Sequence, residues 1–290
     1  MRLVALDRED GKTAAAVLAD RAAAIISGGS YPDVGALLAD GERGMERARE
    51  ALSSGPFEGY EDAELLRPVL SPGATVCVGL NYKTHILEMG RKLPSSPTYF
   101  AKLPRALADP FAEIPLPAVS DRVDYEGELA VVIGRGGRNV PEDEAWGAVA
   151  GFTILNDVSM RDYQYRTLQW FAGKNWEAST PVGPAVVTPD ELDYPWDLEL
   201  IVKVNGDERQ HAQVSDLVFD VPALVADLSK IITLRPGDII ATGTPGGVGE
   251  AMKPKRYLTS GDVVEVAIAN VGSIRNRFVA FENTKLTETI

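Results

Sequence analysis

The sequence predicts a β-rich α+β protein, with a small N-terminal domain over residues 1–70 and a main domain over residues 71–290. From Ala74 onward, short runs rich in Val and Ile alternate with turns that contain Gly or Pro, a pattern typical of strands. Few helical patterns separate these runs, which disfavours a doubly wound α/β sheet. The first 70 residues are instead rich in Ala, and turns with Gly and Pro precede Ala74. These observations predict the fold class and the boundary.

Two stretches of the N-terminal domain have residue patterns that predict helices or strands. The stretch 42–52 places its charges along an exposed face and predicts a helix. The stretch 13–27 is ambiguous, because its alanines favour a helix while two short strands around Ala19 and Asp20 also fit.

The main domain contains six candidate strands and one clear helix. The helix spans residues 220–232, is amphipathic, and has Asp220 in position to cap its first turn. The candidate strands are residues 75–80, 128–134, 147–157, 198–206, 238–244 and 262–272.

The composition of the chain disfavours several classes of binding partner and cellular location. The 290 residues carry a net charge of −13 without a stripe of basic residues, which disfavours nucleic acid and anionic membrane surfaces. No apolar stretch approaches the roughly 20 residues needed to cross a bilayer, and the N-terminus does not resemble a signal peptide. Cys77 is the single cysteine, so no intramolecular disulfide can form. Together these features predict a cytoplasmic protein.

Three acidic residues precede an apolar run in the segment DYEGELAVVIG, residues 124–134. Because side chains alternate faces along a strand, Asp124, Glu126 and Glu128 would share one face. Carboxylates at this spacing repel each other unless a cation such as Mg²⁺ or Ca²⁺ binds between them. The alternative is a solvated edge strand whose acids deter aggregation. The pattern leaves both interpretations open.

A second candidate site lies in GLNYKTHILEMG, residues 79–90. On a helix, His85 and Glu88 share a face, so the carboxylate would orient the imidazole as a general base that activates water. The alternative is an exposed ion pair that contributes little. The other histidine, His211, is predicted to be solvated in a polar turn.

Polar residues follow the apolar run that precedes Asp157. Asp157 would complete a carboxylate set with the two glutamates. Ser159 stands in position to cap a helix, on which Arg161 and Gln164 share one face. Arg161 would then fork onto a substrate carboxylate. The alternative is a surface arginine near a helix N-terminus.

Two further segments suit the stabilisation of an anion. Lys174 sits among aromatic and small residues in GKNWEASTPVGP, where a desolvated ammonium group stabilises a developing oxyanion. The alternative is a lysine that extends to solvent. The Gly-rich segment PGDIIATGTPGGVG offers backbone N–H groups and the Thr244 hydroxyl to a carboxylate.

Together and in this order, these segments resemble the fumarylacetoacetate hydrolase family from about Ala74 to Phe281. The resemblance implies a mixed β-sandwich roll, a homodimer, and a bound Mg²⁺ or Mn²⁺ ion, with Ca²⁺ as a further option. The first 70 residues are similar to the small variable domain of many bacterial members. The segments that carry the resemblance are VGLNYKTHILE, DYEGELAVVIG, NDVSMRDYQ, GKNWEASTPVGP, VNGDERQ and ATGTPGGVG.

The resemblance also implies roles for ten residues. Asp124 and His211 receive no role. Glu177 stands where members often have Asp three residues after the lysine, which is expected to alter the position or the pKa of that lysine. The implied metal ligands are Glu126, Glu128 and Asp157, the catalytic residues are His85, Glu88 and Lys174, and the substrate-binding residues are Tyr82, Arg161, Gln164 and Thr244.

The implied function is metal-dependent hydrolysis of a C–C bond in a small anionic β-diketo acid of the acylpyruvate, fumarylpyruvate or fumarylacetoacetate type. Such acids arise in the degradation of aromatic compounds. The alternative within the family is isomerisation or decarboxylation of a 2-oxo acid, such as 2-hydroxyhepta-2,4-dienedioate, or decarboxylation of oxaloacetate. The alternative from another class is a non-catalytic metal-binding protein on the same fold.

Overall fold

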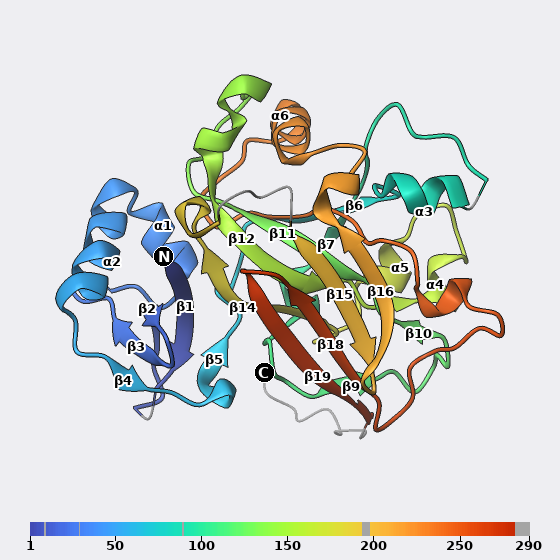
Figure 1. Ribbon diagram of the computed structural model, residues 1–290, viewed down its shortest axis with the longest axis horizontal. Helices are drawn as coiled ribbons and strands as arrows, with labels where there is room; N and C mark the ends of the chain where they lie inside the picture. Colours follow the sequence, from blue (N-terminus) through green and yellow to red (C-terminus); the bar gives the residue numbers. More distant parts are fainter. Residues whose placement is uncertain (9, 29, 89, 193–197, 282–290) are drawn as a thin grey trace, which may run out of the picture.

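The computed structural model describes residues 1–8, 10–28, 30–88, 90–192 and 198–281. Strands dominate it, in two large sheets and one small sheet (Figure 1). This arrangement confirms the prediction of a β-rich α+β protein. Among the described helices, none is both long enough and apolar enough to cross a membrane.

The largest sheet has twelve strands, in the order β4-β3-β2-β1-β14-β12-β11-β17-β6-β7, with β5 beside β1 and β8 beside β14. Its strands are β1 (Arg2–Asp7), β2 (Thr13–Ala19), β3 (Ala22–Ile25), β4 (Glu58–Gly59), β5 (Leu65–Leu66), β6 (Thr75–Gly79), β7 (Thr98–Lys102), β8 (Leu107–Ala108), β11 (Gly127–Ile133), β12 (Val149–Asn156), β14 (Thr180–Val187) and β17 (Ile239–Ala241).

The second sheet has five strands in the order β16-β15-β18-β19-β9, and the small sheet has two. The five strands are β9 (Ile114–Leu116), β15 (Glu199–Val204), β16 (Asp207–Gln213), β18 (Val263–Ile268) and β19 (Gly272–Ala280), and the two are β10 (Val123–Asp124) and β13 (Ser159–Met160). The α-helices are α1 (Val34–Ala39), α2 (Glu42–Ser54), α3 (Lys83–Glu88), α4 (Arg161–Gln164), α5 (Phe171–Lys174) and α6 (Val221–Ile231).

Strand β11 explains the uninterrupted apolar run in the sequence. It lies between β12 and β17, and all of its residues are buried. Leu129 and Val131 face the core shared with the five-stranded sheet, whose orange and red strands lie in front of β11 and β12 in Figure 1. Ala130 and Val132 face a second core, shared with α1 and α2. A strand covered on both faces needs apolar residues at successive positions.

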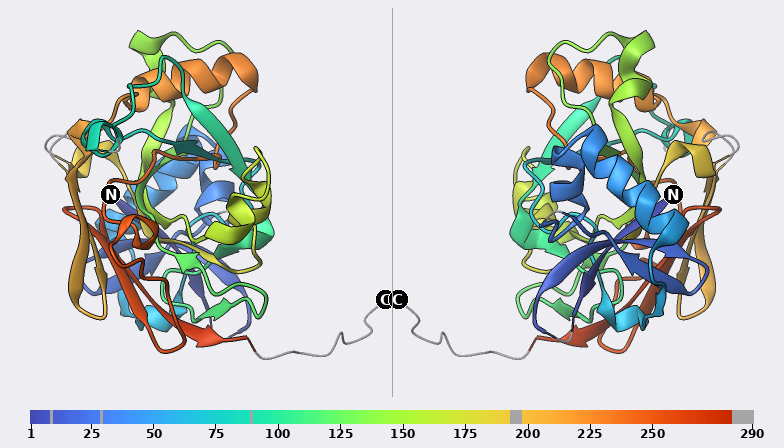
Figure 2. Two further views of the ribbon diagram at one scale, coloured as in Figure 1. Left: turned by 90° about the vertical axis from the view of Figure 1, so that its right-hand side faces the viewer. Right: turned by 90° about the vertical axis from the view of Figure 1, so that its left-hand side faces the viewer.

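The ambiguous stretch 13–27 forms two strands, β2 and β3, joined by a turn in which Asp20 has a φ of 51°. Pairing decides this outcome, because β2 is hydrogen-bonded to β1 over six residue pairs, from Arg2 with Leu18 to Asp7 with Thr13. The helix predicted at 42–52 is confirmed as α2. Helices α1 and α2 cover one face of these strands, as the right-hand view of Figure 2 shows in blue.

The two predicted domains share the twelve-stranded sheet. Strand β1 pairs with β14, with Leu3 opposite Val186. The boundary near residue 70 stays a prediction, because continuous strand pairing does not decide whether the first 70 residues fold alone. The prediction for residues 220–232 is confirmed as α6, whose first turn is capped by Asp220 through a 3.0 Å hydrogen bond from Ala223 N–H.

His211 is exposed, as expected, but it lies on a strand and not in a turn, so the second part of that expectation is wrong. It belongs to β16, which follows a tight turn at Asn205 and Gly206, both with positive φ. Asn-Gly is a strong signal for a hairpin of this kind. The imidazole contacts Glu199 through Nε2 at 2.7 Å and Glu208 through Nδ1 at 3.1 Å. Hydrogen bonding to Glu199 is the main cause that raises the pKa of His211.

The His211→Gln variant is expected to be less stable than the wild type at pH 6 and equally stable at pH 9. A raised folded-state pKa stabilises the protein below the unfolded pKa of about 6.5, and this stabilisation is lost as the pH rises through the folded value. Urea denaturation at both pH values measures the difference. An equal difference at both would show that the charge of His211 does not contribute.

Candidate active site

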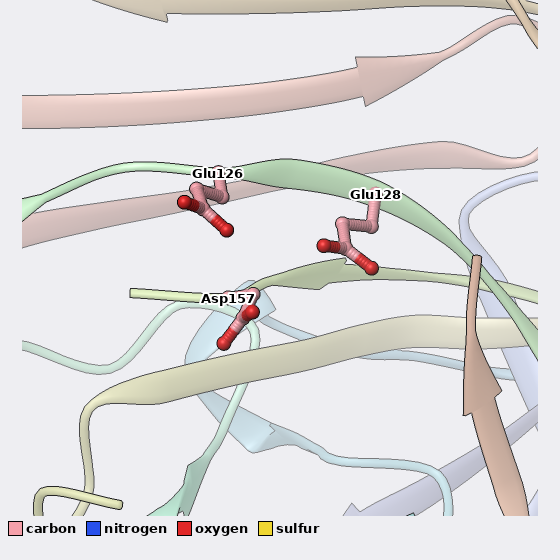
Figure 3. Close-up of side chains that lie close together, drawn as sticks. All are labelled: Glu126, Glu128 and Asp157. Atoms are coloured by element: carbon pink, nitrogen blue, oxygen red, sulfur yellow. The ribbon is translucent and has the colours of Figure 1, made fainter. Parts of the chain in front are cut away.

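Three carboxylates converge where β11 begins and β12 ends. Glu126 precedes β11, Glu128 lies within it, and Asp157 follows β12. Antiparallel pairing brings them together, because Gly127 lies opposite Asn156. The Asp157 N–H also donates to the Glu126 carbonyl oxygen over 2.8 Å. One oxygen from each carboxylate lies within 4.8 Å of the others, and Figure 3 shows both glutamates extending toward Asp157.

The interpretation as a solvated edge strand is wrong for the two glutamates. Strand β11 is paired on both sides, and the exposed fractions of Glu126 and Glu128 are 7% and 1%. The expectation that all three acids share one face of one strand is also wrong. Asp124 belongs to β10, in the small sheet, and the chain changes sheets between Asp124 and Gly127.

Lys174, at the end of α5, places its ammonium group between two of the carboxylates. Its Nζ lies 2.7 Å from Glu126 Oε2 and 2.6 Å from Asp157 Oδ2, and the side chain is buried. Burial lowers the pKa of Lys174, but the charges of Asp157 and Glu126 outweigh it and raise the pKa above its ordinary value. Glu177, expected to influence the lysine, is exposed, and these two acids are the ion-pair partners of Lys174 among the described residues.

A second buried lysine, Lys102 at the end of β7, holds Asp157 from another direction. Its Nζ lies 2.7 Å from Asp157 Oδ1. It also donates to Thr180 Oγ1 at 2.7 Å and to the Lys174 carbonyl oxygen at 2.6 Å. Sequence reasoning missed Lys102, because it ends an ordinary strand pattern and its hydrogen-bond partners lie 72 and 78 residues further along the chain.

Replacing Lys102 with Met is expected to lower the free energy of unfolding by about 3–5 kcal/mol, because breaking a buried ion pair leaves the other charge uncompensated. Urea denaturation followed by circular dichroism measures this loss. The matched control is Lys203→Met, since Lys203 also lies on a strand but is exposed. Equal stability of the two variants would contradict the role of Lys102.

The two glutamates have opposite electrostatic environments. Burial raises the pKa of Glu126, but Lys174 and Arg161 outweigh it and lower this pKa to about 2. Burial raises the pKa of Glu128 well above its ordinary range, and the charges of the other two carboxylates raise it further. Glu126 contacts two cations, whereas Glu128 Oε2 accepts a 2.8 Å hydrogen bond from the neutral Gly243 N–H.

These residues fit a divalent cation. A cation bound there would relieve the repulsion that raises the pKa of Glu128. Carboxylate oxygens held at the ends of two paired strands are the ligands that Mg²⁺, Mn²⁺ and Ca²⁺ prefer. The buried cluster also has one carboxylate more than it has cations: Asp124, Glu126, Glu128 and Asp157 against Lys102, Arg161 and Lys174.

Arg161, at the start of α4, bridges two carboxylates. Its Nη1 lies 2.5 Å from Glu126 Oε1, and its Nη2 lies 2.8 Å from Asp124 Oδ2. Nη1 also donates to Gln164 Oε1 at 3.0 Å, which confirms that Arg161 and Gln164 share a helix face. The expectation that Ser159 caps this helix is wrong. Ser159 belongs to β13, and its hydroxyl donates to a carbonyl oxygen two residues earlier.

The Gly-rich loop is tied to the start of β11 by Gln210, which sequence reasoning left without a role although it ends the segment VNGDERQ. Its Oε1 accepts from Gly127 N–H at 3.0 Å, and its Nε2 donates to Thr244 Oγ1 at 2.8 Å. The Thr244 hydroxyl donates to the Gly127 carbonyl oxygen at 3.0 Å. Gly243 has a φ of +105°, and a Cβ there would lie 3.0 Å from two neighbouring atoms, so glycine lets its N–H reach Glu128.

A cavity of about 530 Å³ gives a small molecule access to the three carboxylates. Phe100 and Trp170 contribute apolar side chains to its lining. The cavity therefore brings together most of the residues that the sequence singled out. Besides the carboxylates, the predicted site residues that line it are His85, Arg161, Gln164, Lys174 and Thr244.

Tyr82 does not line this cavity. Its buried hydroxyl has no hydrogen-bond partner among the described residues, and it lines a second cavity of about 650 Å³. His85, on α3, lines both cavities. The side chain of Glu88 lies outside the described residues, so the pairing of His85 with Glu88 stays a prediction.

Comparison with known proteins agrees with this fold. Residues 74–279 match the family described as fumarylacetoacetate (FAA) hydrolase C-terminal. The chain is 40% identical over 242 residues to an oxaloacetate tautomerase of Xenopus laevis, described as mitochondrial. That match covers 82% of this chain and 76% of the relative.

Two solved structures extend the similarity to nearly the whole chain. Fumarylacetoacetate hydrolase from Exiguobacterium antarcticum has a TM-score of 0.86 at 34% identity, over 97% of this chain and 100% of that chain. Maleylpyruvate hydrolase from Sphingobium sp. SYK-6, in complex with manganese(II) and pyruvate, has a TM-score of 0.80 at 31% identity, with the same coverage. The predicted fold and family resemblance are both confirmed, and this chain belongs to the fumarylacetoacetate hydrolase family, a family of enzymes.

Proposed function

We propose that the protein is a divalent-metal-dependent tautomerase of small 2-oxo dicarboxylic acids, with oxaloacetate as the representative substrate. The reaction moves one proton between carbon 3 and the oxygen of the 2-oxo group, so no atom is gained or lost. The observation that carries the proposal is the buried ammonium group of Lys174 beside the carboxylates that line the cavity. The 40% identity to an oxaloacetate tautomerase also supports it. This proposal favours the isomerase alternative over the hydrolase first expected from the sequence.

The proposed chemistry centres on an enolate. The chemistry that a bound Mg²⁺ or Mn²⁺ ion supplies is Lewis acidity at the 2-oxo group. Lys174 donates a hydrogen bond to the oxygen that becomes anionic when carbon 3 loses its proton. The charges of Asp157 and Glu126 raise its pKa, which favours the protonated form. His85, in the same cavity, carries the proton between carbon and oxygen.

The other polar residues of the cavity suit the carboxylates of the substrate. Arg161 supplies a cation and Gln164 amide N–H groups, while Thr244 lines the cavity with its hydroxyl bonded to the Gly127 carbonyl oxygen. Local cations of this kind explain how a protein with a net charge of −13 captures a dianion.

The test uses purified protein with Mg²⁺ or Mn²⁺ and freshly dissolved enol-oxaloacetate. Enzyme-dependent loss of the enol absorbance without release of CO₂ supports the proposal. Matching release of CO₂ would identify a decarboxylase instead. No change above the uncatalysed rate with either metal would overturn the proposal.

Hydrolysis of an acylpyruvate is the second candidate, and the position of His85 between two cavities favours it. The second cavity is lined largely by polar side chains, including Thr84, Ser215 and Asp216, so it offers water a place beside the imidazole. Acetylpyruvate and maleylpyruvate, assayed for pyruvate and for the second acid, test this reaction. Release of both acids in equal amounts supports it, and loss of enol absorbance without either acid excludes it.

The assembly and the location of the protein stay predictions. We propose a homodimer in the cytoplasm, as the sequence and its family resemblance imply. Light scattering coupled to size-exclusion chromatography measures the mass in solution, and a monomer at micromolar concentration would contradict the dimer.

A further inference from the structure

Asp124 is fully buried, yet the chemistry above gives it no part. Its exposed fraction is 0%, and it is not among the three converging carboxylates. On one side, Arg161 approaches its Oδ2 with Nε at 2.9 Å and Nη2 at 2.8 Å. On the other side, the backbone N–H groups of Gly249 and Glu250 donate to Oδ1 and Oδ2 at 2.8 and 2.9 Å. A buried carboxylate with this many donors is held in one orientation.

The two groups of donors belong to different segments that both line the cavity. Arg161 lies on α4, whereas Glu250 lies on the short 3₁₀ helix η7 (Gly249–Ala251) at the end of the Gly-rich loop. Asp124 precedes Arg161 by 37 residues and Gly249 by 125 residues. One side chain therefore joins two parts of the cavity wall that are far apart in the sequence.

The close approach at Gly249 requires a glycine. A Cβ at this position would lie 2.8 Å from Asp124 Oδ1 and 1.9 Å from the Arg256 carbonyl oxygen. Any other residue would push the turn away from Asp124. The glycine at position 249 is therefore needed for the hydrogen bond between its N–H group and Asp124.

Arg161 needs Asp124 because its other carboxylate is shared. Glu126 also contacts Lys174 and belongs to the group that would hold a metal ion. Asp124 has no part in that group, and its Oδ2 accepts a hydrogen bond from Nε and lies 2.8 Å from Nη2, so it holds the guanidinium at a second edge. With Glu126 alone, Arg161 would be held through Nη1 and could rotate about that contact.

We propose that Asp124 is a positioning residue that fixes Arg161 and the turn at Gly249 and Glu250 relative to each other. The end of the cavity that receives a substrate carboxylate is thereby formed before the substrate binds. The proposal rests on the proposed function only in assigning a substrate carboxylate to Arg161. The fixing of the turn is independent of the reaction.

The first test is a double-mutant cycle of Asp124→Asn and Arg161→Lys. Asparagine keeps the shape and one oxygen but removes the charge and one acceptor. The Asp124→Asn variant is expected to lower kcat/KM for oxaloacetate roughly 10- to 100-fold, and the double variant to equal Arg161→Lys alone. Independent, additive losses would overturn the proposal. The matched control is Asp121→Asn, which changes an exposed aspartate three residues earlier.

The second test separates this proposal from the proposed function. In the Asp124→Asn variant, amide hydrogen exchange at Gly249 and Glu250 is expected to become at least about tenfold faster, with Asp121→Asn like the wild type. The affinity for Mn²⁺, measured by calorimetry, is expected to stay within about twofold of the wild type. Unchanged exchange, or loss of Mn²⁺ binding, would overturn the positioning role. If the wild type turns over no 2-oxo acid, the proposed function fails, while the exchange measurement still decides the role of Asp124.

Discussion

The Glu128→Gln variant is expected to lose tight binding of Mg²⁺ and Mn²⁺ without losing its fold. Loss of a residue that only supports a metal ligand costs about 10- to 100-fold in affinity or activity, so loss of a ligand is expected to cost more. The fold is expected to survive, because glutamine matches the shape of a carboxyl group whose pKa is already raised by burial and by two neighbouring acids. Calorimetry with Mn²⁺ and urea denaturation without metal measure the two effects.

The control for this variant is Glu113→Gln, which makes the same chemical change at an exposed position. Binding of Mn²⁺ by Glu128→Gln with wild-type affinity and stoichiometry would rule out Glu128 as a ligand. A large loss of stability without metal would show that the carboxylate stabilises the fold, and the affinity would then be measured only where the variant is folded.

The His85→Ala variant is expected to lower kcat by about 100- to 10,000-fold while metal binding is retained. Positioned general acid–base catalysis contributes about this much, and His85 is the histidine that lines the cavity beside the carboxylates. Steady-state kinetics on enol-oxaloacetate and calorimetry with Mn²⁺ measure the two quantities. Added imidazole is expected to restore part of the rate, because the cavity created by alanine can hold it.

The matched control is His211→Ala, since His211 lines the second cavity but not the one that holds the carboxylates, and it lies on strand β16 with its side chain exposed. A near-normal kcat of His85→Ala would exclude His85 as the group that carries the proton. Equal losses in both histidine variants would point to a general effect on the fold instead.

Much of the fold can be predicted from the sequence, because many of its strands and helices follow from local patterns of residues. Each of the six apolar runs contains a strand, and Asp220 caps α6 as its position predicts. Strands β14, β16 and β19 were missed, because their alternation is masked by Gly, Pro or charged residues. The stretch 13–27 could not be decided locally, since its alanines suit a helix and only pairing with β1 makes them strands.

The residues of the candidate site also fall into two groups, those that the sequence indicates and those that only the fold reveals. The three converging carboxylates, Lys174 and the Arg161–Gln164 pair lie in the segments that carry the family resemblance, so the sequence singles them out. It does not indicate the roles of Lys102 and Asp124, because each acts through partners that the fold brings in from distant segments. For example, no helical or strand periodicity in the sequence relates Lys102, at the end of β7, to Asp157, just after β12.

By itself, the sequence determined the family, the β-rich fold and the identity of the acidic residues that converge, because these depend on motif content and on strand pairing near the motifs. Only the tertiary structure decided what each acid does. Asp124, Glu126 and Glu128 are alike in the sequence, at every second position. The change of sheet after β10 directs Asp124 to Arg161 and the Gly249 turn, and leaves the two glutamates facing Asp157. The physical reason is that the role of a carboxylate depends on the charges and hydrogen-bond donors around it. Those groups come from distant parts of the chain and meet only in the folded protein.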